Sequence, residues 1–133
     1  MKNREKTPLI ACNLCCILER KEDADLLAQK LQRNGLGAGC IAPKYAKASD
    51  VKITNIPLTG HWYLDEALEE MFSQLRAQMD LLKEIRRSFQ CSYIVDIECH
   101  KGDVYPALVL SGKNMEYIRL LESDVSIDLY DDL

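Results

Sequence analysis

The cysteines are the residues of this chain whose spacing most readily suggests chemistry. Cys12-x-x-Cys15-Cys16 has the spacing of a zinc-binding pair, and Cys99-His100 could complete the ligand set. However, the first pair lies in an apolar stretch with the pattern of a strand, where positions three apart face opposite sides of a sheet. One zinc ion cannot collect both thiolates, and a thioredoxin-type site would need its first thiolate at a helix N-terminus. We therefore predict that the cysteines are buried core thiols.

Asp96 and Glu98 form a second candidate, for a metal-dependent hydrolase or nuclease. Two positions apart in an alternating segment, they project from the same face and could hold a divalent cation. Many such nucleases carry a Glu-x-Lys pair, whereas two residues separate Glu98 from Lys101. Polar residues on the outer face of an antiparallel strand are also the ordinary solvated outcome. This enzyme is kept as an alternative, and the main interpretation expects no metal and no cofactor.

The acidic C-terminal segment is a candidate surface for binding another protein. Asp124, Asp128, Asp131 and Asp132 lie around Tyr130, so carboxylates could steer a basic partner while the aromatic ring is buried against it. A solvated segment that keeps the last strand in water is the competing interpretation. Asp96 and Glu98 would join this surface if their strand neighbours the last one. The two histidines have no recognisable partner set for nucleophilic catalysis, so no catalytic residue is assigned.

Length and charge restrict the remaining possibilities. The 133 residues suit one domain spanning 1–133, with a polar and flexible segment at 1–7. The net charge is -4 and no Lys/Arg-rich run is present, so nucleic acid is disfavoured as a partner. The apolar run at 9–18 is far shorter than the roughly 20 residues that span a membrane. We expect a cytoplasmic protein without a membrane partner.

The elements that must position these residues follow from hydrophobic periodicity. Residues 8–19 are apolar on both faces, which predicts a central strand. Residues 23–33 predict a helix whose apolar stripe is formed by Leu26, Leu27, Lys30 and Leu31. Residues 44–59 predict a long loop, with a short edge strand possible at 51–56. A long amphipathic helix follows Asp65 up to residue 89, and its length favours a kink near Arg76–Met79.

The last third of the chain predicts strands around one short helix. The strands are expected at 60–64, 91–99, 105–110 and 125–129, with a hairpin turn at 101–103 and a helix from Ser111 to Leu121. Val125, Ile127 and Leu129 are expected on the inner face of the last strand. The order β-α-β-α-β-β-α-β predicts an α+β domain: a single mainly antiparallel sheet with helices packed on one side, related to the ferredoxin-like fold.

Several segments together resemble a bacterial family catalogued as domain of unknown function 4279. They are Trp62-Tyr-Leu with the long helix after it, Pro106-Ala-Leu-Val-Leu-Ser111 and Ile127-Asp-Leu-Tyr130, with Ile41-Ala-Pro43 as a weaker match. The resemblance covers most of the chain and supports the architecture, whereas the segment 44–59 departs from the family pattern. It implies no activity, because the family has no agreed one. Some small bacterial domains of this kind are thought to be immunity proteins that neutralise a toxin.

These observations favour a non-enzymatic protein-binding module. The resemblance and the acidic balance together suggest an immunity protein that covers a basic toxin domain. The residues expected to bind the partner are Asp128, Tyr130, Asp131 and Asp132, joined by Asp96 and Glu98. A homodimeric structural module, paired through an exposed strand edge or a long helix face, is a further alternative.

Overall fold

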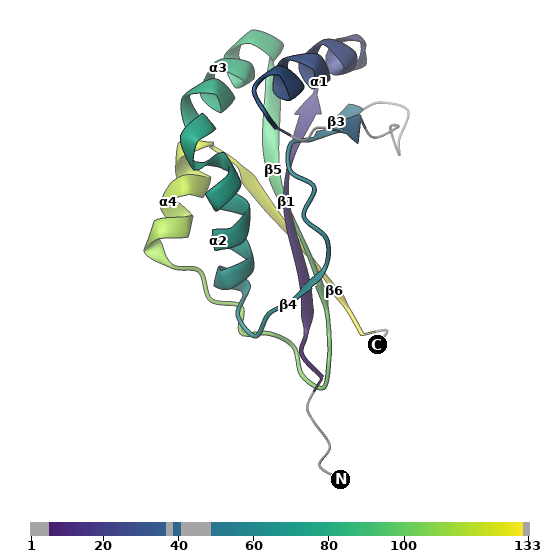
Figure 1. Ribbon diagram of the computed structural model, residues 1–133, viewed down its shortest axis with the longest axis vertical. Helices are drawn as coiled ribbons and strands as arrows, with labels where there is room; N and C mark the ends of the chain where they lie inside the picture. Colours follow the sequence, from purple (N-terminus) through teal and green to yellow (C-terminus); the bar gives the residue numbers. More distant parts are fainter. Residues whose placement is uncertain (1–5, 37–38, 41–48, 132–133) are drawn as a thin grey trace.

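A mainly antiparallel sheet organises the fold. The structure is a computed structural model that describes residues 6–36, 39–40 and 49–131 (Figure 1). The strands are β1 (Leu9–Leu18), β2 (Gly39–Cys40), β3 (Ser49–Lys52), β4 (Thr59–Gly60), β5 (Cys91–His100) and β6 (Asp124–Tyr130). Their order is β2-β3-β1-β5-β6, and β4 pairs with the first residues of β1. The pairing of β5 with β6 is parallel and the other pairings are antiparallel.

The helices lie against one face of this sheet, so the predicted α+β class is confirmed (Figure 1). They are α1 (Ala24–Arg33), α2 (Leu64–Leu75), α3 (Met79–Phe89) and α4 (Gly112–Leu120), with 3-10 turns η1 (Lys21–Asp23) and η2 (Arg76–Gln78). α1 stands beside α3, where Lys30 pairs with Glu84 at 3.3 Å. Among the described residues, no helix has the length and apolar character needed to cross a membrane.

β1 is the central strand, as its apolar run predicts. Ile10, Cys12, Leu14, Cys16 and Leu18 point toward the helices and are at most 2% exposed. Each lies opposite a buried residue of β5, from Cys99 at one end to Cys91 at the other. The two strands therefore supply one continuous apolar surface, onto which the periodic faces of α2 and α3 pack.

The predicted break in the long helix is present. α2 ends at Leu75, η2 spans Arg76–Gln78, and α3 begins at Met79. The break lets two apolar stripes, rather than one, follow the twisted sheet. Beyond it, the Tyr93 hydroxyl on β5 donates a hydrogen bond to the Leu82 carbonyl oxygen on α3 at 2.5 Å. This contact satisfies a buried phenol and fixes α3 on the sheet.

The predicted hairpin between residues 91–99 and 105–110 is wrong. β1 pairs with β5 along its whole length, and β6 occupies the other side of β5, so no edge remains for a third neighbour. Residues 104–110 instead form an irregular connection whose Ala107 makes a single parallel bridge to Tyr63. The expected order β-α-β-α-β-β-α-β therefore fails here, since one strand and not two separates α3 from α4. The ferredoxin-like relation stays a prediction.

A hydrogen-bonded cluster ties α4 to α2. Ser111 accepts a hydrogen bond from the Asn114 N–H and caps α4, as predicted. Asp65 Oδ1 accepts hydrogen bonds from the Ser111 N–H at 2.9 Å and the Asn114 side-chain amide at 2.8 Å. Partial burial opposes ionisation of Asp65, but these hydrogen bonds and the nearby Lys113 charge outweigh it and lower the pKa of the carboxyl.

Asn13, a polar residue within the apolar run of β1, holds the chain that follows β3. Its side-chain amide donates to the Ile56 carbonyl oxygen at 2.9 Å, and its Oδ1 accepts from the Ile56 N–H at 2.6 Å. The Thr54 hydroxyl donates to the same Oδ1 at 2.9 Å and accepts from the Leu14 N–H at 2.9 Å. The amide thus replaces a neighbouring strand at a point where backbone pairing is interrupted.

Three further sequence expectations need adjustment. The possible edge strand at 51–56 lies earlier, as β3, and the expected strand at 60–64 gives way to α2 at Leu64. Leu26, assigned to the buried stripe of α1, is 56% exposed. Part of the predicted flexible segment 1–7, part of the predicted loop 44–59, and Asp132 lie outside the described residues.

Candidate functional site

The sheet face opposite the helices gathers the predicted partner-binding residues. Side chains alternate along β5, so Asp96 and Glu98 point away from the core residues Val95, Ile97 and Cys99. The parallel register places Asp96 beside Ser126 and Glu98 beside Asp128. The two strands are therefore neighbours, so the condition under which Asp96 and Glu98 were expected to join the acidic C-terminal surface is met.

We call this surface the acidic face and define it by Asp96 and Glu98 of β5 and by Asp124, Asp128 and Tyr130 of β6. Asp96, Asp124, Asp128 and Tyr130 are exposed, and the Glu98 side chain is 44% exposed. In Figure 1 no helix covers this side of β5 and β6. Four carboxylates on a flat, uncovered surface make a local negative field. Asp124 belongs to the acidic segment noted in the sequence but not to the residues expected to bind the partner; it joins the face because it pairs with Ile94, in line with Asp128 and Tyr130.

His100 and Tyr130 close one end of the acidic face. Their rings stack with centroids 4.6 Å apart and planes 11° from parallel. His100 Nε2 lies 2.7 Å from Glu98 Oε2, so the imidazole sits between a carboxylate and an aromatic ring. No local sequence pattern indicates this contact, because it depends on the register of β6 against β5. The arrangement orients the imidazole and the phenol at one end of the paired strands, where 13% of the His100 side chain and 40% of Tyr130 are exposed.

Asp131 lies just beyond this end, next to a cation. Lys101 Nζ is 3.7 Å from Asp131 Oδ1 and 5.5 Å from the centroid of the Tyr105 ring. The Lys101 N–H also donates to the Tyr130 carbonyl oxygen at 2.9 Å. The Asp131 charge is therefore partly balanced within the chain. Of the predicted set, the structure brings together Asp96, Glu98, Asp128 and Tyr130, with Asp131 at the margin.

The carboxylates of the acidic face were also the basis of the metal-dependent alternative. In the part of the chain that the structure describes, no group of three or more His, Cys, Asp or Glu side chains is placed to hold a metal ion. The hydrolase or nuclease using Asp96 and Glu98 stays a prediction. Calorimetric titration with Mg²⁺, Mn²⁺ and Zn²⁺ separates it from a binding module.

The cysteines behave as core thiols wherever their side chains are described. Cys12, Cys15, Cys16, Cys91 and Cys99 are free and buried, which confirms the prediction for these positions. Burial raises the pKa of Cys12 to about 12 and that of Cys15 to about 11. Cys12 and Cys16 face the helices while Cys15 faces the other side, as the strand pattern requires.

Cys16 and Cys91 are an electrostatically linked pair at the opposite end of β5 from His100. A hydrogen bond between the two thiols lowers the pKa of Cys91, helped by the positive charge of Arg86, although burial acts in the other direction. The same hydrogen bond, together with burial, raises the pKa of Cys16. Cys91 lines a cavity of about 970 Å³ whose wall also carries Lys83, Arg86 and Arg87. Of the five cysteines whose side chains are described, Cys91 is therefore the one best placed to react.

A second surface is apolar, and its residues are more exposed than the inner face expected for the last strand would be. Val125, Ile127 and Leu129 point to the helix side of β6, as predicted, but they are 39%, 42% and 51% exposed. The helices do not extend over the outer strand far enough to cover them. Periodicity shows which way a side chain points, but it does not show where the covering layer ends.

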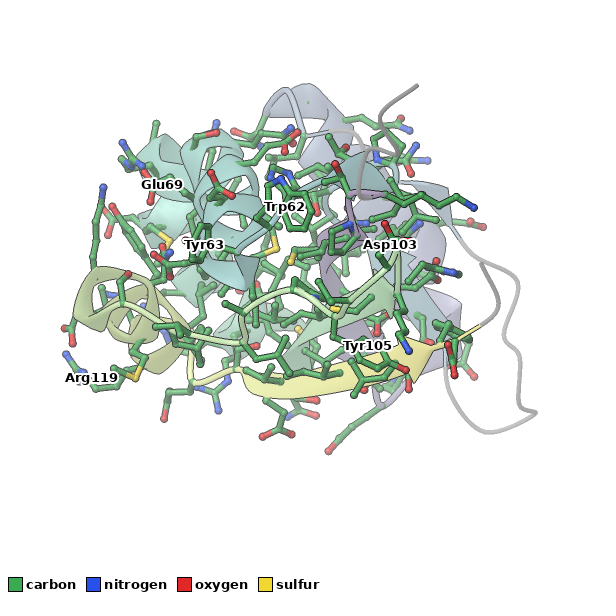
Figure 2. All side chains as sticks on the ribbon, turned by 90° about the horizontal axis from the view of Figure 1, so that it is seen from below. Trp62, Tyr63, Glu69, Asp103, Tyr105 and Arg119 are labelled. Carbon is green, nitrogen blue, oxygen red and sulfur yellow. The ribbon has the colours of Figure 1, made fainter. Side chains whose placement is uncertain are left out.

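We call the wider surface the apolar edge and define it by the large exposed apolar residues between Val104 and Leu129. They are Val104, Tyr105, Leu108, Val109, Met115, Val125, Ile127 and Leu129. Figure 2 shows Tyr105 and the connection between β5 and α4 on the same side of the molecule as β6. Exposed apolar patches of this kind mark sites of protein association more often than isolated exposed residues do.

A comparison of the chain with protein-family models, with curated proteins and with solved structures found no match.

Proposed function

We propose that this chain is a non-enzymatic protein-binding module whose acidic face binds a basic surface of another protein. The observation that carries the proposal is the register of β5 and β6, which sets Asp96, Glu98, Asp128 and Tyr130 side by side on an uncovered sheet face. Carboxylates at this spacing match lysine and arginine side chains of a partner, and the phenol of Tyr130 adds area that a partner can bury.

The shape of the acidic face also favours a macromolecular partner. The face is the surface of two paired strands that no helix covers (Figure 1), whereas the cavity of about 970 Å³ lies at the other end of β5, around Cys91. Small molecules bind mainly in concave sites that enclose most of their surface, whereas proteins associate through broad and nearly flat patches. The net charge of -4 would steer a basic partner toward the chain from a distance.

An immunity protein that neutralises a basic bacterial toxin is the specific form that we propose. Its support is the resemblance to domain of unknown function 4279, which itself stays a prediction, together with the acidic face. Covering a cationic active site with carboxylates would exclude a polyanionic substrate from that site. Asp131, at the margin of the face, would extend the same negative surface. Asp132, also expected to bind the partner, lies outside the described residues.

The test is capture of partners from an extract of the source cells by the immobilised full chain. The variant carries Asp96→Lys, Glu98→Lys and Asp128→Lys, which reverse the charge of the face without touching the core. We expect one or more basic proteins to be retained by the wild type and lost with this variant. Retention should fall as salt rises, because an exposed charged interface is screened.

The matched control carries Glu66→Lys, Asp80→Lys and Glu116→Lys on the helices, all at exposed positions. It changes the net charge by the same amount, so it separates the position of the charges from their total. Equal loss with both variants would show non-specific electrostatics. Equal retention by all three proteins, or no retained basic protein, would reject the acidic face as the binding surface.

A further inference from the structure

β6 is an outer strand with little of the usual protection against pairing. β5 occupies one of its sides, and among the described residues no strand pairs with the other. Edge strands are commonly blocked by charged side chains, lysine above all, by proline, by a bulge or by very short length. β6 runs for seven residues, Asp124–Tyr130; its sequence DVSIDLY contains neither lysine nor proline, and its only charged side chains are Asp124 and Asp128. Its outward N–H and C=O groups are therefore a template for another strand.

The apolar edge supplies the area that a stable association needs. Exposed fractions of 39–61% on its eight residues, each with roughly 150–250 Å² of surface when fully extended, give on the order of 700 Å². The largest apolar patch of a typical monomer is about 300–600 Å². A standard protein interface buries about 800 Å² on each partner. The summed exposed area of the residues of the apolar edge is thus close to one side of a stable dimer.

The sequence of β6 is complementary to itself in one antiparallel register. A twofold axis through Ile127 and normal to the sheet sets Ile127 opposite its own copy and Val125 opposite Leu129. On the acidic face, Ser126 then lies opposite Asp128, and Asp124 lies opposite Tyr130. No two carboxylates face each other directly, and Val125, Ile127 and Leu129 each meet another aliphatic residue.

The neighbouring registers lack this property. An axis through Ser126 sets Asp124 directly opposite Asp128, and an axis through Asp128 sets that carboxylate opposite its own copy. An axis between two residues would pair side chains from opposite faces of the sheet, which antiparallel pairing does not allow. The register through Ile127 is therefore the one that satisfies both charge and hydrophobic pattern.

We propose that two copies of this chain associate through β6, in antiparallel register about Ile127, so that their sheets become one continuous sheet. The helix layers then lie on the same side, and the two halves of the apolar edge bury each other. The two acidic faces become adjacent on the other side, which doubles the surface offered to a basic partner. The dimer does not depend on the proposed function, because its contacts come from the opposite face and from the backbone of β6.

Sedimentation of the full chain from ~1 µM to ~1 mM tests the proposal, since Kd values in this range correspond to about 8 to 4 kcal/mol of binding. We expect a monomer–dimer equilibrium whose Kd rises at least about 100-fold with Ile127→Asp, which buries two facing carboxylates at the axis. The matched control is Leu26→Asp on α1, where the replaced side chain is 56% exposed and lies off the apolar edge. That variant should leave Kd unchanged.

Added salt gives an independent readout that separates dimer formation from partner binding. Each copy carries a net charge of -4, so screening should lower the dimer Kd, whereas binding of a basic protein should weaken. A chain that remains monomeric at ~1 mM overturns the proposal. Equal effects of the two aspartate variants on Kd also overturn it, because the dimer would then not involve β6.

Disulfide trapping tests the register itself and does not need a destabilising charge. Directly opposite residues in an antiparallel pair have Cα atoms about 4.5–5.5 Å apart, within the roughly 4.4–6.8 Å of a disulfide. Under mild oxidation Ile127→Cys should form a covalent dimer, in larger amount than wild type or the control Leu26→Cys. Equal cross-linking of both variants, or none for Ile127→Cys, counts against the axis through this residue.

Discussion

Replacing Asn13 should remove the hydrogen bonds that hold the segment after β3 and lower the stability of the fold. Asn13→Ala removes the acceptor of the Ile56 N–H at 2.6 Å, the donor to the Ile56 carbonyl at 2.9 Å, and the acceptor of the Thr54 hydroxyl at 2.9 Å. Asn13, Thr54 and Ile56 are 6%, 2% and 6% exposed, so water does not readily replace the amide. The two backbone groups of Ile56 are then left unsatisfied in the interior.

The expected cost follows from those two groups. An unsatisfied buried donor or acceptor costs about 1–3 kcal/mol. The Thr54 hydroxyl keeps its hydrogen bond from the Leu14 N–H and adds little to the loss. The free energy of unfolding should therefore fall by about 3 kcal/mol, against a typical total of about 5–15 kcal/mol. Urea unfolding followed by the fluorescence of Trp62, the single tryptophan, measures this change.

Asn13→Asp tests the donor to Ile56 separately, through pH. An ionised carboxylate would face the Ile56 carbonyl oxygen, whereas a neutral carboxyl can still donate a hydrogen bond to it. The native state favours the neutral form, so the folded pKa of the introduced group exceeds its unfolded value of about 3.9. The variant should be closest to wild type below that unfolded pKa, and its deficit should grow as pH rises through the folded pKa.

Asn55→Ala is the matched control, because Asn55 lies in the same segment but is exposed. Its effect should stay within about 0.5 kcal/mol. A loss under about 1 kcal/mol for Asn13→Ala at an unchanged denaturant slope would falsify the role given to the amide. An equal deficit of Asn13→Asp at pH 4 and pH 7, each measured against wild type at the same pH, would exclude the donor to Ile56.

Three further outcomes are expected. Because its pKa is lowered in the folded chain, Asp65 stabilises the fold above its unfolded pKa. Wild type should therefore lose more stability than Asp65→Ala as pH falls below that value. Urea unfolding between pH 3 and pH 6 checks this, and an equal pH dependence of the free energy of unfolding in both proteins would contradict it. Cys91, with its pKa lowered by the hydrogen bond from Cys16, should be the first described thiol that iodoacetamide alkylates, and Cys16→Ala should shift its alkylation to higher pH; peptide mass spectrometry measures both, and earlier labelling of another described thiol would contradict it. A Cβ at Gly102 would collide with the Lys6 carbonyl oxygen, so Gly102→Ala should lower the free energy of unfolding by about 1–3 kcal/mol. Thermal or urea unfolding measures this, and an unchanged free energy of unfolding would show that the backbone at Lys6 moves aside without loss of stability.

Local periodicity correctly predicted the elements that are recognisable without knowing which other elements they pair with. The alternation at 91–99 and the apolar run at 8–19 give β5 and β1 nearly to the residue, and the helix periodicity gives α2 and α3 with the break between them. The hairpin failed because Lys101-Gly102-Asp103 is a local turn signal, while the neighbours of β5 come from distant parts of the chain. β1 takes one side of β5 and β6 takes the other. Long-range pairing leaves little trace in a single sequence.

The candidate site divides in the same way. Asp96 and Glu98 share a face because the side-chain period of a strand is two, and this follows from the sequence alone. Their position beside Asp128 depends on the parallel register of β6, which no local pattern encodes. The exposure of Ile127 depends on how far the helix layer reaches over the sheet. The residues of the acidic face were therefore predictable, whereas the apolar edge was not.

The pairing of β1 with β5 also bears on how the chain is made. Leu18 pairs with Cys91 and Leu9 with His100, so β1 leaves the ribosome long before its main neighbour exists. At translation rates of roughly 5–20 residues per second, β1 waits on the order of 4–18 s. Its sequence LIACNLCCIL has no charge and no proline, the composition of an aggregation-prone segment. The strand at the centre of the finished sheet is thus an aggregation hazard in the nascent chain until β5 has been made.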